Sequence, residues 1–296
     1  MTVKKTILVI GSTGQQGGSV ARYLLNDGTF NVRCMVRNTD SPKVKELLEK
    51  GAQVVKGDLN SVESLTNAMV GCYGVFGVTN FWDSDCGYDK EILHGQNIGH
   101  ACKNNHIEHL VFSTLDRHSD VSHFESKVMA EDYIRKLNVP TTFLVTSFYF
   151  ENYMSFFPPK PDENGDLVFT VAQKATTKVP MFACHDTGGW VLEIFKHHNK
   201  FVGKDVAAVG EYISYPEIVD TFNRVNKTNA RFQELPLDVF RSFGFPGVHE
   251  LAANLQFFDD ISDGVKEDRR KINGCMHCTF KGETWEEFLV RTGWQG

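Results

Sequence analysis

The chain has 296 residues, enough to bury a sizeable core without disulfides or metals. Its 31 lysines and arginines against 37 aspartates and glutamates give a formal charge of −6, which argues against a general attraction to nucleic acid or anionic membranes. The apolar run 7–10 is too short for a membrane span or signal-peptide core, and the seven cysteines are odd in number and scattered. We therefore expect a soluble cytoplasmic protein, with the nucleus as a second compartment.

Strand-like and helix-like segments alternate regularly through the first half of the chain. Strands are expected at residues 6–10, 31–36, 52–56, 74–78, 110–112 and 141–145. Helices are expected between them, at residues 15–27, 43–50, 61–70, 89–104 and 124–136. Because crossovers between parallel strands are right-handed, this order predicts an α/β fold with a Rossmann-like, doubly wound parallel sheet.

The regular alternation ends after residue 147. A turn-rich loop is expected at residues 157–166, and shorter elements follow, namely strands at 168–171 and 205–209 and helices at 215–224, 237–243 and 285–291. We therefore expect a Rossmann domain over residues 1–147. Residues 148–296 are expected to form a smaller α/β lobe on the substrate or partner side, with the two parts able to interleave.

The segment GSTGQQGG at residues 11–18 lies between the first expected strand and the first expected helix. In that setting Gly11 permits a tight turn, Gly14 lets the backbone approach a pyrophosphate, and Gly17 lets the helix pack closely on the strand. The free N–H groups and dipole of the helix N-terminus favour a phosphate there. The segment predicts a dinucleotide site, although such a turn can also be purely structural.

The second expected strand ends in MVRNTDSP, where an acidic residue would bind the ribose 2′-hydroxyl of NAD. Here the residue is Arg37, whose guanidinium can pair with a 2′-phosphate in bidentate fashion. This favours NADP over NAD. The alternative is an arginine that is merely solvated at a strand end.

The later strands also end in polar residues. Ligands of open parallel sheets bind outside the carboxyl ends of the strands, so these residues should lie at one edge. Each alone could equally cap a loop, but together they favour a bound dinucleotide. They are Asp58 and Leu59, Thr79, Asn80 and Phe81, and Ser113.

Seven segments of the sequence resemble the NmrA-like family, atypical members of the short-chain dehydrogenase superfamily, and most closely its animal redox-sensor branch. They are GSTGQQGGSVARYLLNDGTF (11–30), VRN (36–38), GDL (57–59), VTNFW (78–82), HFESK (123–127), FYFEN (148–152) and FGFPG (243–247). The resemblance implies NADPH binding in preference to NADP and a dimer that responds to the cofactor. It also implies regulatory protein partners and movement between cytoplasm and nucleus.

The resemblance also implies a set of cofactor-binding residues. They are Gly11, Ser12, Thr13, Gly14, Gln15 and Gln16; Arg37, Asn38, Thr39, Asp40 and Ser41; Asp58, Leu59, Thr79, Asn80 and Phe81; Lys127; and Phe148, Tyr149, Phe150 and Glu151. Gly17 and Ser113 join the predicted site because of the glycine spacing and the strand end described above. The family carries more basic residues after Arg37 than the NTDSP of this chain. Binding of a 2′-phosphate would then depend on Arg37, with help from Asn38 and the backbone.

In a working short-chain dehydrogenase, a tyrosine four residues before the lysine exchanges the carbonyl proton. Here Lys127 keeps the lysine position, and His123 stands in place of the tyrosine. Imidazole could donate a proton, but a packing or capping role for His123 is the simpler interpretation. We therefore expect an NADP(H)-binding redox sensor without catalytic residues. The alternative is an NADPH-dependent reductase of a small carbonyl, quinone or enone that uses Lys127 and His123.

The remaining segments give weaker evidence of a functional site. The segment CMHC at 275–278 lacks a second ligand pair, so no metal site is expected. No Cys–His arrangement that marks a nucleophile is visible in the sequence. The aromatic segment 236–260 is expected to roof a cavity, to form a subunit interface or to pack in the core.

Overall fold

The computed structural model describes residues 3–296, and the chain forms two compact units. The first unit comprises the residues up to Thr146 together with His185–Ala208 and Asn273–Phe280. The second comprises Ser147–Cys184, Val209–Ile272 and Lys281–Gly296. Each unit is therefore assembled from separate stretches of the chain.

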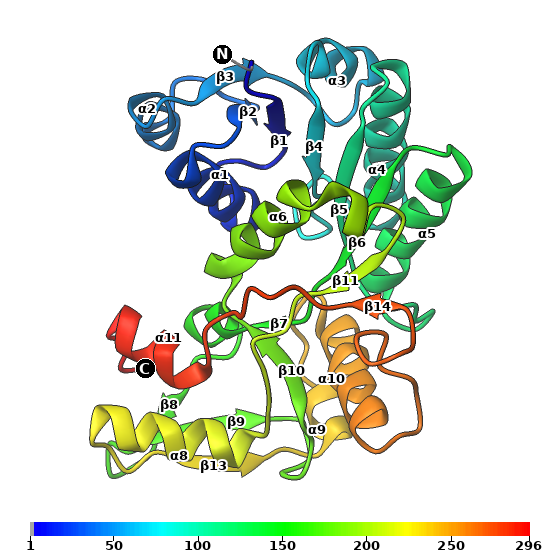
Figure 1. Ribbon diagram of the computed structural model, residues 1–296. Coiled ribbons are helices and arrows are strands. Elements are labelled where there is room, and N and C mark those ends of the chain that lie inside the picture. Colours follow the sequence, from blue (N-terminus) through cyan, green and yellow to red (C-terminus); the bar gives the residue numbers. More distant parts are fainter. Residues whose placement is uncertain (1–2) are drawn as a thin grey trace. The chain divides into compact units, whose positions relative to one another are not determined.

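An eight-stranded sheet forms the centre of the first unit (Figure 1). Its strand order is β14-β11-β6-β5-β4-β1-β2-β3, and every pairing in it is parallel. The strands are β1 (Thr6–Val9), β2 (Asn31–Val36), β3 (Gln53–Lys56), β4 (Gly74–Gly77), β5 (His109–Thr114), β6 (Thr141–Val145), β11 (Asp205–Ala207) and β14 (Cys275–Met276). The predicted doubly wound sheet is confirmed, and β11 and β14 extend it at one edge.

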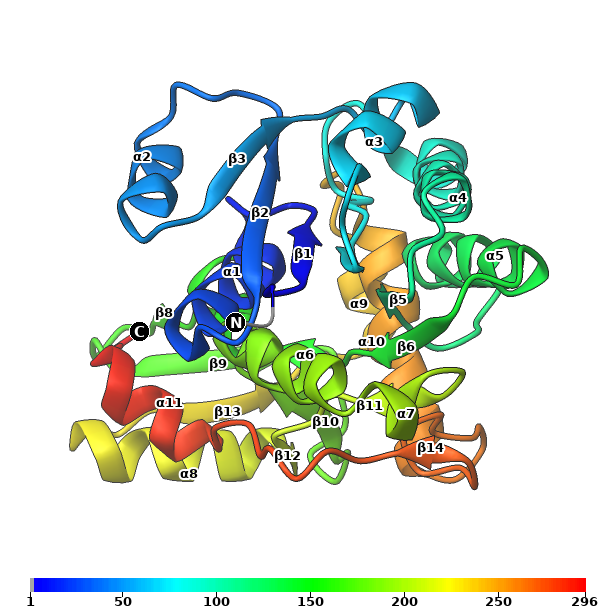
Figure 2. The same ribbon diagram turned by 45° about the horizontal axis from the view of Figure 1, so that its top comes forward.

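Helices connect these strands and cover the sheet. They are α1 (Gln15–Asp27), α2 (Pro42–Glu49), α3 (Val62–Met69), α4 (Gly87–Asn104), α5 (Ser122–Lys136), α6 (Thr187–Lys196) and α7 (His198–Phe201). Helix α1 packs against α6, and α3, α4 and α5 pack in sequence beside one another (Figures 1 and 2). The five predicted helices are confirmed to within two residues at each end. Among the described residues, no helix is both long and apolar enough to cross a membrane.

The core of the first unit explains its apolar strands. Parallel strands covered on both faces read as continuous apolar runs, and all six residues of β5 are buried. Leu8, Val75, Leu110 and Phe112 are fully buried in one cluster between the sheet and helices α3 to α5. The carboxyl ends of these strands carry the polar residues discussed below.

The second unit holds two three-stranded sheets, ordered β12-β10-β7 and β13-β9-β8. Their strands are β7 (Phe148–Tyr149), β8 (Lys160–Pro161), β9 (Leu167–Val171), β10 (Val179–Phe182), β12 (Glu211–Ile213) and β13 (Arg231–Glu234). The helices are the 3-10 helix η1 (Phe150–Met154) and α8 (Tyr215–Asn226), α9 (Leu237–Arg241), α10 (Val248–Ser262) and α11 (Trp285–Thr292). Aromatic residues fill its core, where the Trp285 indole N–H donates to the Ile218 carbonyl at 3.0 Å.

Candidate nucleotide-binding site

The glycine turn joins β1 to α1 with the expected geometry. Gly11 has a φ of 66°, and its carbonyl accepts a 2.8 Å hydrogen bond from the Gly14 N–H. A Cβ on Gly17 would lie 2.5 Å from the Ile10 carbonyl oxygen and closer still to Gly11. Helix α1 has no side-chain cap and no acidic residue in its first turn, so its positive end can receive an anion.

Two side chains brace this turn. The buried Ser12 hydroxyl donates to the Met35 carbonyl at 3.0 Å, so it ties the turn to β2 and leaves only its backbone for a ligand. The Lys43 ammonium at the start of α2 donates to the Thr13 carbonyl at 3.0 Å. Sequence reasoning missed Lys43, which adds an exposed cation beside the turn where the segment after Arg37 lacks one. Its place depends on how α2 packs, which no local pattern reveals.

Arg37 lies exposed at the end of β2. Its side chain is 81% exposed and pairs with the Asp83 carboxylate at 2.9 Å. The following residues 38–40 are exposed, and the Asn38 amide oxygen accepts from the Asp40 N–H at 2.9 Å. Ser41 is the N-cap residue of α2. Arg37 is thus a surface cation paired with a half-buried carboxylate, and a phosphate could take the place of that carboxylate at small cost.

Asp58 stabilises the loop after β3 by hydrogen bonds. Its carboxylate accepts from the Asn60 N–H at 2.9 Å and from the Asn60 side chain at 2.8 Å. These hydrogen bonds, the backbone one first, lower the pKa of Asp58. Leu59 packs against the core, and its carbonyl accepts from the Asn97 amide at 2.8 Å. The loop-capping role that the sequence left open is therefore present, while Asp58 stays exposed toward solvent.

A buried polar network lies where β4 ends. The Lys127 ammonium is 2.5 Å from the Glu91 carboxylate, 3.1 Å from the Thr79 carbonyl and 3.2 Å from the Thr79 hydroxyl. The same carboxylate accepts from the Thr79 hydroxyl at 2.8 Å and from the Ser126 hydroxyl. Glu91 is fully buried and Lys127 is 12% exposed. Sequence reasoning missed Glu91, because an acid in a helix normally indicates a solvated face.

His123 lies four residues before Lys127 on α5. Its ring packs against aromatic rings, with centroid distances of 4.8 Å to Phe124, 5.3 Å to Trp82 and 5.8 Å to Phe81. This is the packing role that the sequence favoured over proton donation. It also places the Phe81 side chain in an aromatic cluster.

Two further predicted residues lie at the same strand ends. The Asn80 amide oxygen accepts from the Trp82 N–H at 3.2 Å, which shapes the loop after β4. Ser113 is buried in β5, and its hydroxyl oxygen has no hydrogen-bond partner among residues 3–296. An orphan hydroxyl at a strand's carboxyl end is consistent with a ligand-binding edge.

The predicted contacts at residues 148–151 belong to the second unit. Phe148 and Tyr149 form β7, which pairs with β10, and the Tyr149 ring lies 5.1 Å from Phe182. Phe150 is fully buried against Trp285, so its side chain serves the core of this unit. The Glu151 carboxylate accepts from the Cys184 N–H at 2.9 Å.

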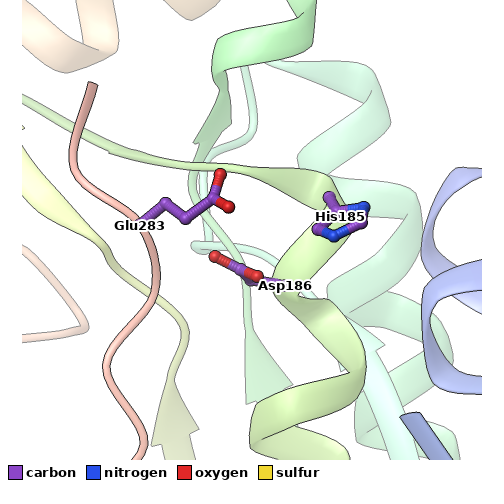
Figure 3. A group of neighbouring side chains, drawn as sticks. All are labelled: His185, Asp186 and Glu283. Atoms are coloured by element: carbon purple, nitrogen blue, oxygen red, sulfur yellow. The ribbon is translucent and has the colours of Figure 1, made fainter. Parts of the chain in front are cut away.

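A further polar group precedes α6. Figure 3 labels His185 and Asp186 in the turn that leads into this helix; the third labelled residue, Glu283, belongs to the second unit. The His185 carbonyl accepts from Arg22 at 2.6 Å and from Ser19, and the Tyr23 hydroxyl donates to Asp186 at 3.0 Å. Burial, then Asp186, raises the pKa of Tyr23 to about 12. These contacts bind α1 to α6, and we assign them a structural role.

Comparison with known proteins identifies relatives along nearly the whole chain. A sequence profile described as the NmrA-like family matches residues 3–289. An NmrA-like family domain-containing protein of Dictyostelium discoideum is 30% identical over 99% of both chains. The NmrA-like family domain-containing oxidoreductase FrzB of a Cladobotryum species is 31% identical over 83% of this chain and 80% of its own.

Solved structures share the fold. The negative transcriptional regulator NmrA, in complex with NAD, superimposes with a TM-score of 0.78 at 23% identity, covering 97% of this chain and 94% of its own. The NADPH-dependent quinone oxidoreductase QOR2 of Escherichia coli, complexed with NADPH, gives a TM-score of 0.76 at 18% identity over 97% and 99%. At these identities the likeness concerns the fold alone.

Proposed function

This chain belongs to the NmrA-like family, and we propose that it is an NADP(H)-binding redox sensor that regulates protein partners. One observation carries the proposal. Where a dehydrogenase presents a tyrosine and a free lysine, His123 is packed among aromatic rings and Lys127 is paired with the buried Glu91. The lysine can still hold a ribose hydroxyl near its Thr79 contacts, while proton transfer has lost its usual donor.

The residues of the first unit fit a dinucleotide. The uncapped end of α1 suits a pyrophosphate, and Gly14 at the N-cap keeps the approach free of a side chain. Arg37 and Lys43 supply cations for a 2′-phosphate, which favours NADP(H) over NAD(H). The solved relatives are named with NAD, NADP and NADPH, which supports the same ligand class here. In this proposal the first unit binds the cofactor and the second serves partners.

Calorimetric titration with NADPH, NADP, NADH and NAD, with the oligomer size recorded in parallel, tests this function. We expect NADPH to bind most tightly and to change the proportion of dimer. A ligand shifts an equilibrium only by its difference in affinity for the two states, so assembly must respond differently to NADPH and NADP. Equal binding of NADH, or an oligomer that ignores every nucleotide, would contradict the proposal.

Two substitutions, one at Arg37 and one at its partner Asp83, sharpen that titration. Arg37→Ala removes the charged hydrogen bonds to the 2′-phosphate, so we expect NADPH affinity to fall about tenfold or more while NADH affinity stays unchanged. Asp83→Asn frees Arg37 from its surface partner and should tighten NADPH binding up to about fivefold. If Arg37→Ala weakened NADH equally, the arginine would not be reading the phosphate.

We propose that the partner surface lies in the second unit. Phe243 and Phe245 are 43% and 40% exposed, and both rings pack 5.8 Å from Phe240. The surrounding segment, residues 241–250, lines a hollow in the surface. Exposed aromatic rings beside a hollow are typical of protein contacts, which suits a homodimer or a regulatory partner.

A reductase is the second candidate function, because several relatives are named oxidoreductases. In that case Lys127 and His123 would face the reacting carbonyl. We expect no steady NADPH oxidation with a panel of quinones and enones. If turnover were found, the double variant Glu91→Gln/Lys127→Met, which leaves no buried charge unpaired, should abolish it even when NADPH is raised until the variant is saturated. Turnover lost in that way would replace the sensor function by the reductase.

A further inference from the structure

Three polar side chains line up behind a cysteine at the start of α4. The Cys86 sulfur lies 3.8 Å from His94 Nδ1, and His94 Nε2 lies 3.1 Å from the Asn60 side-chain oxygen. Cys86 is the N-cap residue of α4, and His94 lies two turns along the same helix and is 8% exposed. The sequence showed no such arrangement, because Asn60 comes from the loop after β3. The structure therefore brings together a Cys–His pair that the sequence did not single out.

Hydrogen bonds fix the tautomer of His94. The Asn60 amide N–H₂ donates to the Asp58 carboxylate at 2.8 Å, so the Asn60 oxygen must be the atom that faces His94. An amide oxygen only accepts, so His94 Nε2 carries the proton. The lone pair of Nδ1 then points at the Cys86 thiol, where it can accept the thiol proton. Asp58, Asn60 and His94 thus form a relay that ends at sulfur.

The surroundings keep both groups neutral at rest. Burial, then Glu91, raises the pKa of the Cys86 thiol, and burial, then Lys90, lowers the pKa of His94. The thiol therefore reacts by giving its proton to His94 as sulfur attacks, and no resting thiolate is needed. The charged groups that act on Cys86 or His94 are Asp58, Asp83, Lys90, Glu91 and Lys127.

Two partly exposed aromatic residues lie close to the cysteine in the sequence. Trp82 and Tyr88 flank Cys86 in the sequence and are 44% and 38% exposed. Exposed aromatic faces stack on planar conjugated molecules. A thiol that has His94 as a base and such rings two to four residues away along the chain suits a planar, soft electrophile.

We infer that Cys86 is a reactive thiol that adds to quinones or enones with His94 as its base. A bond forms between sulfur and the β-carbon of the enone, and the carbon–carbon π bond breaks. The thiol proton moves to His94 Nδ1 and then to the enolate, so the addition needs no oxidant or reductant. The inference does not depend on NADP(H) binding.

Alkylation of the full-length protein by N-phenylmaleimide, a planar enone-type probe, tests this inference. Peptide mass spectrometry follows each cysteine over time. Cys72 is the internal control, because it is also half-buried and has a raised pKa through burial, but lies beside Arg33 at 3.4 Å instead of a histidine. We expect Cys86 to be modified at least about tenfold faster than Cys72.

Two variants test whether the reactivity of Cys86 depends on His94 and Asn60 or only on the exposure of the thiol to solvent. His94→Gln should lower the alkylation rate of Cys86 about tenfold or more and leave the alkylation rate of Cys72 unchanged. Without the base, the alkylation rate of Cys86 should rise steadily with pH. Asn60 is exposed, so Asn60→Ala threatens the fold less. This variant should lower the alkylation rate of Cys86 several-fold, because the proton of His94 is then no longer held on Nε2. Equal rates at Cys86 and Cys72, or a Cys86 rate indifferent to both variants, would overturn the inference.

Discussion

Replacing Glu91 by glutamine is expected to lower the free energy of unfolding by about 3–5 kcal/mol. Three donors converge on this fully buried carboxylate, from Thr79, Ser126 and Lys127. A glutamine amide has only one accepting oxygen, so one donor would meet an N–H₂ group. The Lys127 charge, only 12% exposed, would also lose its counter-ion. An unpaired buried charge is costly because water can no longer solvate it.

A double-mutant cycle isolates the pair. The variant Glu91→Gln/Lys127→Met removes both charges and should recover most of the loss, since a buried pair is often worth little more than its neutral replacement. The matched control is the pair Glu46–Lys50, 2.6 Å apart but exposed, where Glu46→Gln should cost far less than Glu91→Gln because water screens the pair. The cycle is completed by the single variant Lys127→Met, and urea unfolding with unchanged slope measures all four variants. A cost for Glu91→Gln as small as the control's would show that Lys127 is solvated.

The first unit was predictable because its local signals agree with its fold. Strands β1 and β4 at the centre of the sheet are mostly apolar runs, and each of the strands β1 to β5 is followed by a helix that begins near Ser, Pro or Gly. The start of helix α6 is hidden in the sequence for a definite reason. It begins Thr-Gly-Gly, which locally favours a turn, yet a Cβ on Gly188 would lie 2.5 Å from the Ser19 carbonyl oxygen and one on Gly189 would overlap the Phe280 ring. These glycines are needed for close packing.

The candidate site was predictable only where one segment carries the chemistry. The glycine turn is such a segment, and Gly11 adopts the left-handed φ expected of it. Glu91 and Lys127 come from two different helices. Lys43 comes from α2, whereas its partner Thr13 lies in the glycine turn. A single sequence gives no sign of which distant side chains will meet, so these contacts required the structure.

The second large effect is expected when Gly17 is replaced by alanine, and the same replacement at its helix neighbour Gly18 is the comparison. A Cβ at Gly17 would lie 2.5 Å from the Ile10 carbonyl oxygen, where the rigid backbone of the turn cannot give way; Gly18 would meet the Ser12 carbonyl oxygen at an ordinary 3.4 Å. We expect Gly17→Ala to cost about 3 kcal/mol by overpacking and to abolish nucleotide binding, since the turn must shift.

Gly18→Ala should be neutral or stabilise by up to about 1 kcal/mol, because alanine is the better helix former. Urea unfolding and NADPH titration of both variants measure the contrast. If Gly17→Ala bound NADPH as the parent does, the turn would not be the phosphate site. Equal losses of stability in both variants would instead indicate that α1 tolerates no side chain on this face, so close packing at Gly17 would not be the specific requirement.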